Sequence, residues 1–163
     1  MSPNQTTLIN RYRRQGIMID TNLLLMLVIG DTDESVIRTF KRTQRFSPDD
    51  YHVLQNVITR FDQQITTSHI LTEVSNLAGQ LTGDLRQAVY ISFQTQINTM
   101  NEVSVDAKHI VDTSMFSQFG ITDTAIYLAS KDRFLVITTD SPLYGYLIGN
   151  GVDAINFNHL LTP

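Results

Sequence analysis

The chain has 163 residues, of which 42% are hydrophobic, and this is enough to bury the core of a single domain spanning 1–163. It contains no cysteine, which excludes disulfides and thiolate metal sites and leaves histidine and oxygen ligands for any metal ion. The net charge of −4 argues against a nonspecific nucleic-acid binder, because such proteins are usually basic.

The N-terminal part begins with a polar arm, residues 1–15, whose arginines are not followed by the apolar core of a secretory signal. The apolar stretch 16–30 is interrupted by Asp-Thr-Asn and is shorter than the roughly 20 residues of a membrane helix. It predicts a buried strand at 16–20 and a central helix at 22–29. These segments favour a cytoplasmic protein with no membrane contact.

The next segment predicts two helices and a strand. A capping residue at 32–33 predicts a helix that reaches about Arg45. Ser47, followed by proline and two acidic residues, predicts a helix that reaches Phe61. A short β-branched run at 65–67 predicts the second strand.

Two helices are expected to follow this strand. Ser68 is placed to cap the first, which carries Glu73. The second runs from Leu85 to about Met100 and has apolar residues at a four-residue spacing, which predicts one buried stripe: Leu85, Val89, Phe93 and Ile97.

The last third repeats the alternation of strands and helices. We expect short strands at 103–105, 134–138 and 153–157. The helices between them are expected at 109–119, closed by Gly120; at 123–131, capped by Thr122; and from Ser141-Pro142 to Gly149. Strands that alternate with helices through short connections predict a three-layer α/β/α fold with a mostly parallel central sheet.

Four carboxylates lie where apolar runs meet helix caps: Asp20 in IMIDTNLLL, Glu73 in ILTEVSNLA, Asp123 in GITDTAIYLA and Asp140 in LVITTDSPL. Open α/β sheets collect their functional groups at such element ends. The chain has none of the motifs of P-loop, dinucleotide-binding, serine-hydrolase or zincin proteins. The acid set therefore predicts a divalent-metal site.

The ordered set of MIDTNLLL, TSHILTEVSNL and ITDTAIYLASKDRFLVITTDSPL resembles the PIN-domain ribonucleases, over residues 17–157. The resemblance implies one or two Mg²⁺ or Mn²⁺ ions that serve phosphodiester cleavage of RNA. It implies that the metal-site acids are Asp20, Glu73, Asp123 and Asp140, supported by hydrogen bonds from Asn22 and Thr139. Many small members are toxins of toxin–antitoxin pairs, which implies an antitoxin protein as partner. The helix expected at 48–61 and the N-terminal arm are additions to the pattern of a compact toxin.

The chemistry of the reaction also calls for such a set. A phosphodiester is anionic and gathers further charge on oxygen in the transition state, so hard cations held by carboxylates favour its hydrolysis. We expect Asp20 and Asp123 to be direct ligands and Asp140 to bind a second ion or a metal-bound water. Glu73 is expected to be a ligand or the base for the nucleophilic water.

Each acid also has a structural interpretation. Asp20 and Asp140 are placed to cap the helices that follow them, and Asp123 to interact with a helix dipole. Glu73 is too far from Ser68 for a capping box and has apolar neighbours in sequence, so we expect it to be partly buried.

Other residues contribute less. His69 lies four residues before Glu73 and so shares its helix face, whereas the other histidines show no ligand spacing. The densest basic segment is a candidate RNA-backbone contact, although a solvated helix face is the better explanation on general grounds: Arg38, Lys41, Arg42 and Arg45. The apolar helices beginning at Asn22 and Leu85 suggest a homodimer. The alternative to a ribonuclease is a catalytically inactive PIN-like module that binds RNA or protein.

Overall fold

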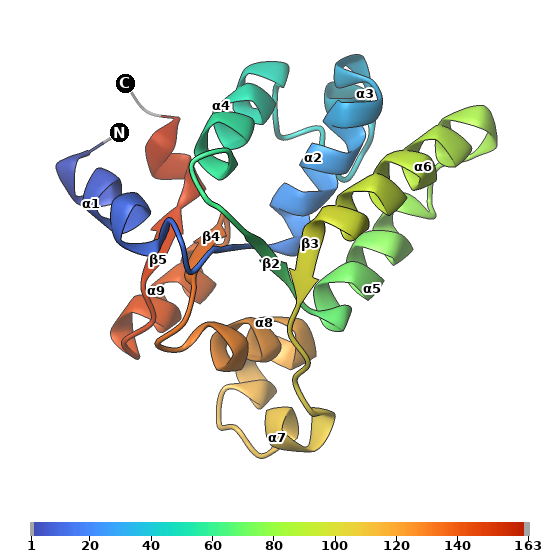
Figure 1. Cartoon of the computed structure of the whole chain (residues 1–163). Coiled ribbons are helices and arrows are strands. Elements are labelled where there is room, and N and C mark those ends of the chain that lie inside the picture. The colour runs from blue at the N-terminus through green and yellow to red at the C-terminus, as the bar shows by residue number, and fades with distance from the viewer. Residues whose placement is uncertain (1, 162–163) are drawn as a thin grey trace.

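Figure 1 shows a computed structural model of the chain, which describes residues 2–161. Within these residues lies a sheet of five parallel strands in the order β3-β2-β1-β4-β5. The strands are β1 (Ile17–Ile19), β2 (Gln64–Thr66), β3 (Met100–Glu102), β4 (Leu135–Thr138) and β5 (Ala154–Asn156). Helices cover both faces of the sheet, so the expected three-layer α/β/α fold is confirmed.

One face of the sheet is covered by α2 and the helices packed against it, and the other by α8 and α9 (Figure 1). The first layer contains α2 (Thr21–Thr32), α3 (Glu34–Thr39), α4 (Pro48–Ile58), α5 (Ser68–Ala78) and α6 (Gly83–Thr99). The second contains α8 (Phe116–Ser130) and α9 (Ser141–Gly149), with the short α7 (Ala107–Val111) packed on α8. A 3₁₀ turn, η1 (Phe157–Leu160), follows β5.

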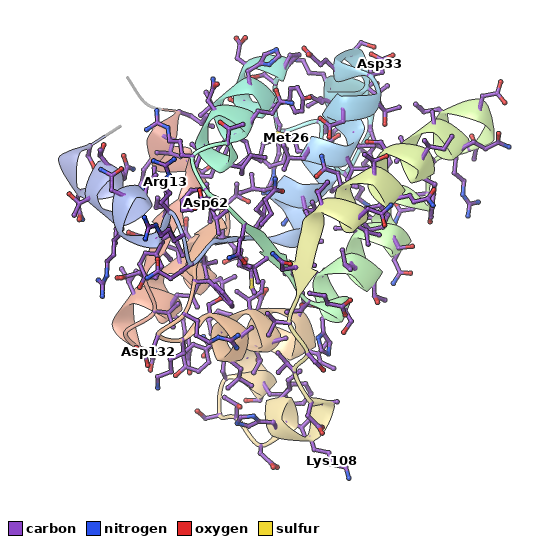
Figure 2. The ribbon with its side chains drawn as sticks, viewed as in Figure 1. Arg13, Met26, Asp33, Asp62, Lys108 and Asp132 are labelled. Carbon is purple, nitrogen blue, oxygen red and sulfur yellow. The ribbon has the colours of Figure 1, made fainter. Side chains whose placement is uncertain are left out.

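The helix α2 is buried on all sides. Every residue from Leu23 to Gly30 is buried, and Met26 lies among the helices of this layer in Figure 2. Gly30 allows the ring of Tyr51 on α4 to approach closely, since a Cβ at Gly30 would lie 2.4 Å from it. The predicted central helix is confirmed and extends three residues further, to Thr32.

The strand order places a topological switch point between β1 and β4. These strands are neighbours, yet the helix that follows β1 covers one face and the helix that follows β4 covers the other. In open parallel sheets, ligands bind at the carboxyl ends of the two strands where the chain diverges in this way. Asp20 follows β1 directly, and Asp140 lies two residues beyond β4.

Some predicted boundaries are wrong. The helix expected to reach Arg45 ends at Thr39, and the chain then turns, because the buried hydroxyl of Thr43 donates to the carbonyl oxygen of Ile37 at 2.9 Å. The helix expected at 109–119 is divided into α7 and the first turn of α8. The third strand lies at Met100–Glu102 rather than at 103–105.

Two predicted helix caps and one predicted apolar stripe also differ from the structure. Thr67 caps α5, with its hydroxyl accepting from the N–H of Ile70 at 3.3 Å, and Ser68 is the first helical residue. Thr122 does not begin a helix, because α8 runs through it after a kink at Gly120, where φ is 78°. Ile97, expected in the buried stripe of α6, is exposed, whereas Val89 and Phe93 are buried.

The polar N-terminal arm forms a helix, α1 (Pro3–Tyr12), which begins with a capping box between Ser2 and Gln5. It packs through the buried Ile9 and through Tyr12, whose hydroxyl donates to Asp153 at 2.8 Å. Arg13 pairs with Asp62 at 3.6 Å, and the two lie side by side in Figure 2. None of the helices within residues 2–161 combines the length and apolar character needed to cross a membrane.

Candidate functional site

The four predicted acids come from four elements around the carboxyl end of the sheet. Asp20 follows β1 and caps α2, and Asp140 follows β4 and caps α9. Glu73 lies on α5, which follows β2, and Asp123 lies on α8, three residues beyond the kink at Gly120. The acids differ in exposure: Asp20 is buried, Asp123 is half-buried, and Glu73 and Asp140 are exposed.

Asp20 is fixed by hydrogen bonds to both of its oxygens. Oδ1 accepts from the N–H of Leu23 at 3.0 Å, and Oδ2 accepts from the N–H of Thr139 at 3.1 Å and from the hydroxyl of Thr138. Burial raises the pKa of Asp20, although these bonds and the positive charge of Arg45 favour the ionised form. Oδ1 accepts a single hydrogen bond from the protein, so this oxygen keeps a lone pair for a further ligand.

Asp123 lies within electrostatic range of the other three acids. Its pKa is raised to about 7, first by burial and then by the negative charges of Asp140, Asp20 and Glu73. Three separate segments of the chain therefore bring their carboxylates close enough to Asp123 to oppose its ionisation. That these four residues form one metal site stays a prediction.

The environment of Glu73 differs from the prediction. Its neighbours Ile70, Val74 and Ala78 form the buried face of α5, and Glu73 itself is exposed on the flank of the helix. The expectation that it is partly buried was wrong because sequence neighbours in a helix point in different directions. Its Oε2 accepts from the hydroxyl of Thr21 at 3.0 Å, which ties α5 to the start of α2.

Threonines support these acids, and two of them were missed from the sequence. Thr138 donates to Asp20 and accepts from the N–H of Asp140 at 2.9 Å, so it links two acids, and Thr21 holds Glu73. Thr21 follows Asp20 directly and Thr138 lies two residues before Asp140, and these short spacings are the sequence signal of their roles. Thr139 supports Asp20 as predicted, through its backbone N–H. Asn22, which was also expected to support the acids, is the second residue of α2 and is half-buried.

Arg45 is the member of the predicted basic segment that reaches the acids. Its Nη2 donates to the hydroxyl of Thr139 at 2.7 Å, and its guanidinium lies 4.7 Å from the ring centre of the buried Phe46. By contrast, Arg42 donates to Gln80 at 2.9 Å, and Arg38 is exposed on α3, while Lys41 is exposed beyond its end. Arg45 lies in the turn after α3 rather than on a helix face.

A hollow adjoins the acids between α5 and α8. It has a volume of about 400 Å³, and His69 and Glu73 both line it, which confirms that they share a helix face. The remaining histidines lie elsewhere: His52 is 3.2 Å from Glu34, and His159 packs edge-on against Tyr144. His109 lies in the last turn of α7.

The four acids and their threonine partners suit a hard divalent cation, because the atoms they could offer as metal ligands are carboxylate or hydroxyl oxygens. Across the described part of the chain, no three histidine, aspartate or glutamate side chains lie in a ready chelating arrangement. Carboxylates that lie near one another with no cation between them repel each other. A cation would relieve the repulsion that raises the pKa of Asp123.

Comparisons with known proteins do not assign this chain to a family: no family model, no curated protein and no solved structure matches it.

Proposed function

We propose that this protein is a metal-dependent endoribonuclease of PIN-domain type, which hydrolyses RNA phosphodiester bonds at Asp20, Glu73, Asp123 and Asp140. The observation that carries the proposal is the coupling of Asp123 to the other three acids at the switch point of a parallel sheet. Helix capping alone does not require carboxylates from different elements to lie near one another. Asp123 caps no helix, and burying it beside three like charges costs stability, which is typical of a functional site.

The proposed roles follow from exposure and hydrogen bonding. Asp20 is the anchored group, since Thr138, Thr139 and Leu23 hold its carboxylate in one orientation. Asp123 is the group whose charge is most dependent on a cation. Glu73 and Asp140 are exposed and face incoming substrate, and Glu73 is the candidate base for the attacking water. Mg²⁺ or Mn²⁺, when bound, would neutralise phosphate oxygens and lower the pKa of that water.

Arg45 supports the RNA part of the proposal. It places a guanidinium beside Asp20 and Thr139 in a protein whose net charge is −4. A guanidinium binds phosphate oxygens through paired donors, so Arg45 is suited to hold the RNA backbone next to the acids. The resemblance to small PIN-domain toxins extends the proposal to a toxin that is neutralised by an antitoxin protein.

The test is cleavage of a mixed pool of structured and single-stranded RNA by purified protein in Mn²⁺, in Mg²⁺ and in EDTA. Asp20→Asn and Asp123→Asn are run beside the wild type, with Asp49→Asn as a matched change at an exposed carboxylate of α4. We expect cleavage that needs metal, that falls at least about 100-fold in the two site variants, and that is unchanged in Asp49→Asn. Equal cleavage by Asp123→Asn and wild type would refute the proposal.

A second candidate function is a PIN-like module that binds RNA or protein without turnover. It is favoured by the lack of a ready chelating set within residues 2–161 and by the acidic net charge. Such a module has no need of a cation, so its carboxylates should show no Mn²⁺ binding. Mn²⁺ titration of wild type and Asp123→Asn separates this candidate from a selective nuclease whose RNA target is missing from the pool.

A further inference from the structure

A basic pocket lies where α1 leads into β1, at the edge of the sheet opposite to the four acids. Its volume is about 540 Å³, which is within the roughly 300–1,000 Å³ of typical small-ligand sites. This α1–β1 pocket is lined by Asn10, Arg11, Arg13, Arg14, Gln15 and Asp62. The lining residues precede the amino ends of β1 and β2, whereas Asp20 and Asp140 follow the carboxyl ends of β1 and β4. The pocket is therefore separate from the candidate metal site.

The α1–β1 pocket gathers three of the 12 lysine and arginine residues of an acidic chain. Arg11 pairs with Asp153 at 3.0 Å, and Arg13 pairs with Asp62 at 3.6 Å beside it in Figure 2. Both arginine side chains are about two-thirds exposed, at 66% and 69%. A guanidinium carries five N–H donors, so each of these arginines keeps donors for a second anion.

Arg14 is the cation of the pocket that the protein leaves unmatched. Its side chain is exposed, and it forms no ion pair within the described part of the chain. A helix C-terminus favours a nearby cation, which accounts for Arg11 in the last turn of α1. Arg14 lies beyond the C-cap residue Arg13, so helix capping does not account for it. The side-chain amides of Asn10 and Gln15 add neutral donors to the same lining.

Hydrogen bonds hold the turn that carries these arginines. The carbonyl oxygen of Arg13 accepts from the N–H of Asp62 at 2.8 Å, and that of Arg14 accepts from the side-chain amide of Gln63 at 3.2 Å. Gly16 closes the turn with a φ of 113°, a conformation that residues with a side chain rarely adopt. The backbone beneath the guanidinium groups is thus ordered in the free protein, which lowers the entropic cost of binding a ligand.

We propose that the α1–β1 pocket binds a phosphate group. Guanidinium groups bind phosphate oxygens through paired, charge-assisted hydrogen bonds, and a phosphate presents several oxygens that three arginines can share. The group can belong to a free nucleotide or to a nucleic-acid backbone, because both present the same oxygens. The inference does not rest on the proposed nuclease function, since the pocket contains none of the four acids and needs no metal ion.

The first test is calorimetric titration of the full-length protein with inorganic phosphate and with adenosine monophosphate. EDTA keeps divalent cations from the acids, and about 0.15 M sodium chloride screens unspecific attraction. Arg14→Gln should weaken binding at least about tenfold, because it removes charge-assisted hydrogen bonds. Arg86→Gln on α6 is the control, since it removes the same charge outside the pocket, and it should bind within about twofold of wild type. Absence of saturable binding to wild type, or equal weakening in the two variants, would overturn the inference.

The second test removes the anion that competes with the ligand. Asp62→Asn frees the guanidinium of Arg13 and keeps the backbone N–H that supports the turn, so phosphate should bind at least about threefold more tightly. Asp49→Asn on α4 changes the net charge equally and should have little effect. Weaker binding by Asp62→Asn than by Asp49→Asn would contradict a pocket in which Arg13 serves the ligand.

The last test locates the bound group and identifies its source. Amide shifts in NMR spectra on adding adenosine monophosphate should include residues 10–16, and adenosine, which lacks the phosphate, should cause none there. An oligodeoxynucleotide with hydroxyl ends, whose phosphates are all diesters, is then added as a competitor. Displacement of the nucleotide would assign the group to a nucleic-acid backbone, and failure to displace it would assign a free phosphate monoester. Shifts at Asp20 and Asp123 with none at residues 10–16 would overturn the inference.

Discussion

At the scale of single residues, Asp20 combines a helix cap with hydrogen bonds to a second strand end. Its Oδ1 caps α2 and its Oδ2 is held by Thr138 and Thr139. Asp140 likewise caps α9 through the N–H of Leu143 at 2.8 Å while it acts electrostatically on Asp123. The capping predicted for Asp20 and Asp140 is therefore confirmed, and it fixes the orientation of both carboxylates.

Thr138 and Thr139 make a matched pair for testing how Asp20 is held. Thr138→Val removes the side-chain donor to the buried Asp20 and the acceptor for Asp140, so we expect a loss of about 1–3 kcal/mol of unfolding free energy. Thr139→Val keeps its backbone N–H to Asp20 and loses only the contact with exposed Arg45, so we expect a loss below about 0.5 kcal/mol. Urea unfolding measures both, and equal losses would contradict the assigned bonds.

Asp123 makes the stability of the metal-free protein depend on pH. Its folded pKa of about 7 lies above the unfolded value of about 3.9, so between these values the folded state binds the extra proton. Stability should fall as pH rises from about 4 to 7 and then level off. In EDTA at pH 8, Asp123→Asn should be more stable than wild type by about 1–2 kcal/mol, after allowance for solvent screening.

Thermal unfolding of wild type and Asp123→Asn between pH 5 and 8 in EDTA checks this prediction. Asp112→Asn, a change at an exposed aspartate beyond α7, is the control and should follow the wild-type curve. A variant that is less stable than wild type at pH 8 would mean that Asp123 is a structural group. A more stable variant that has lost activity is typical of a residue kept for function.

The positions of Asp20 and Asp140 at strand ends were predictable because each follows a buried apolar run. The exposure of Glu73 was not, because Leu71 and Val74 are its sequence neighbours but lie at different angles around α5. Thr138 was missed because a threonine that ends a strand is common, and its bond to Asp20 joins residues 118 positions apart.

At the scale of elements, α2 fixes the geometry of the first layer. It is buried from Leu23 to Gly30 and packs against α3, α4, α5 and α6, and its N-cap Asp20 stands at its start. The contact between Gly30 and the ring of Tyr51 sets how closely α4 approaches α2. Any displacement of α2 along its axis would therefore move Asp20 and Thr21 together, and with them the bond to Glu73.

Two glycine-to-alanine changes in helices test this packing. In Gly30→Ala the new methyl would lie 2.4 Å from the Tyr51 ring, so we expect a loss of about 1–3 kcal/mol despite the better helix propensity of alanine. Gly145→Ala in α9 meets no atom within 4 Å, so we expect a gain of up to about 1 kcal/mol. Chemical denaturation compares the two, and a stabilised Gly30→Ala would contradict the close packing of α2 on α4.

Elements were easier to predict than their ends. Four strands, β1, β2, β4 and β5, and the alternation of strands with helices follow from apolar or β-branched runs and capping residues, whereas β3 has no buried residue and was expected at 103–105. The end of α3 was not predictable from the sequence, because the turn at 40–46 depends on the tertiary burial of Thr43 and Phe46. This turn places Arg45 beside Thr139, so the helix end that was wrongly predicted is also the one that brings a guanidinium to the candidate site.

At the scale of the whole molecule, the structure limits which surface a homodimer would use. The apolar residues of α2 are buried in the core of their own chain, so this helix offers no apolar surface to a partner. On α6, Ile91 and Ile97 are 66% and 37% exposed, and we expect any dimer to bury this helix. Light scattering should then give a dimer that Ile91→Asp shifts toward monomer, whereas a monomeric wild type at high concentration would refute the dimer.

The net charge of −4 is informative only when its distribution is considered. Asp140, Asp20 and Glu73 act electrostatically on Asp123, and a divalent cation bound among them would make a site that attracts phosphate. Arg45 adds positive charge at the same place. The acidic composition is therefore compatible with RNA as the substrate, because the proposed site depends on bound metal more than on a basic surface.

Mn²⁺ binding is the measurement that tests the central claim most directly, because every proposed step at the acids requires it. Isothermal titration calorimetry would be run on wild type, Asp123→Asn and the control Asp49→Asn. We predict saturable binding to wild type and to Asp49→Asn that weakens at least about tenfold in Asp123→Asn. Absence of binding to the folded wild type, or equal binding by Asp123→Asn, would contradict the assignment of these carboxylates to a metal site.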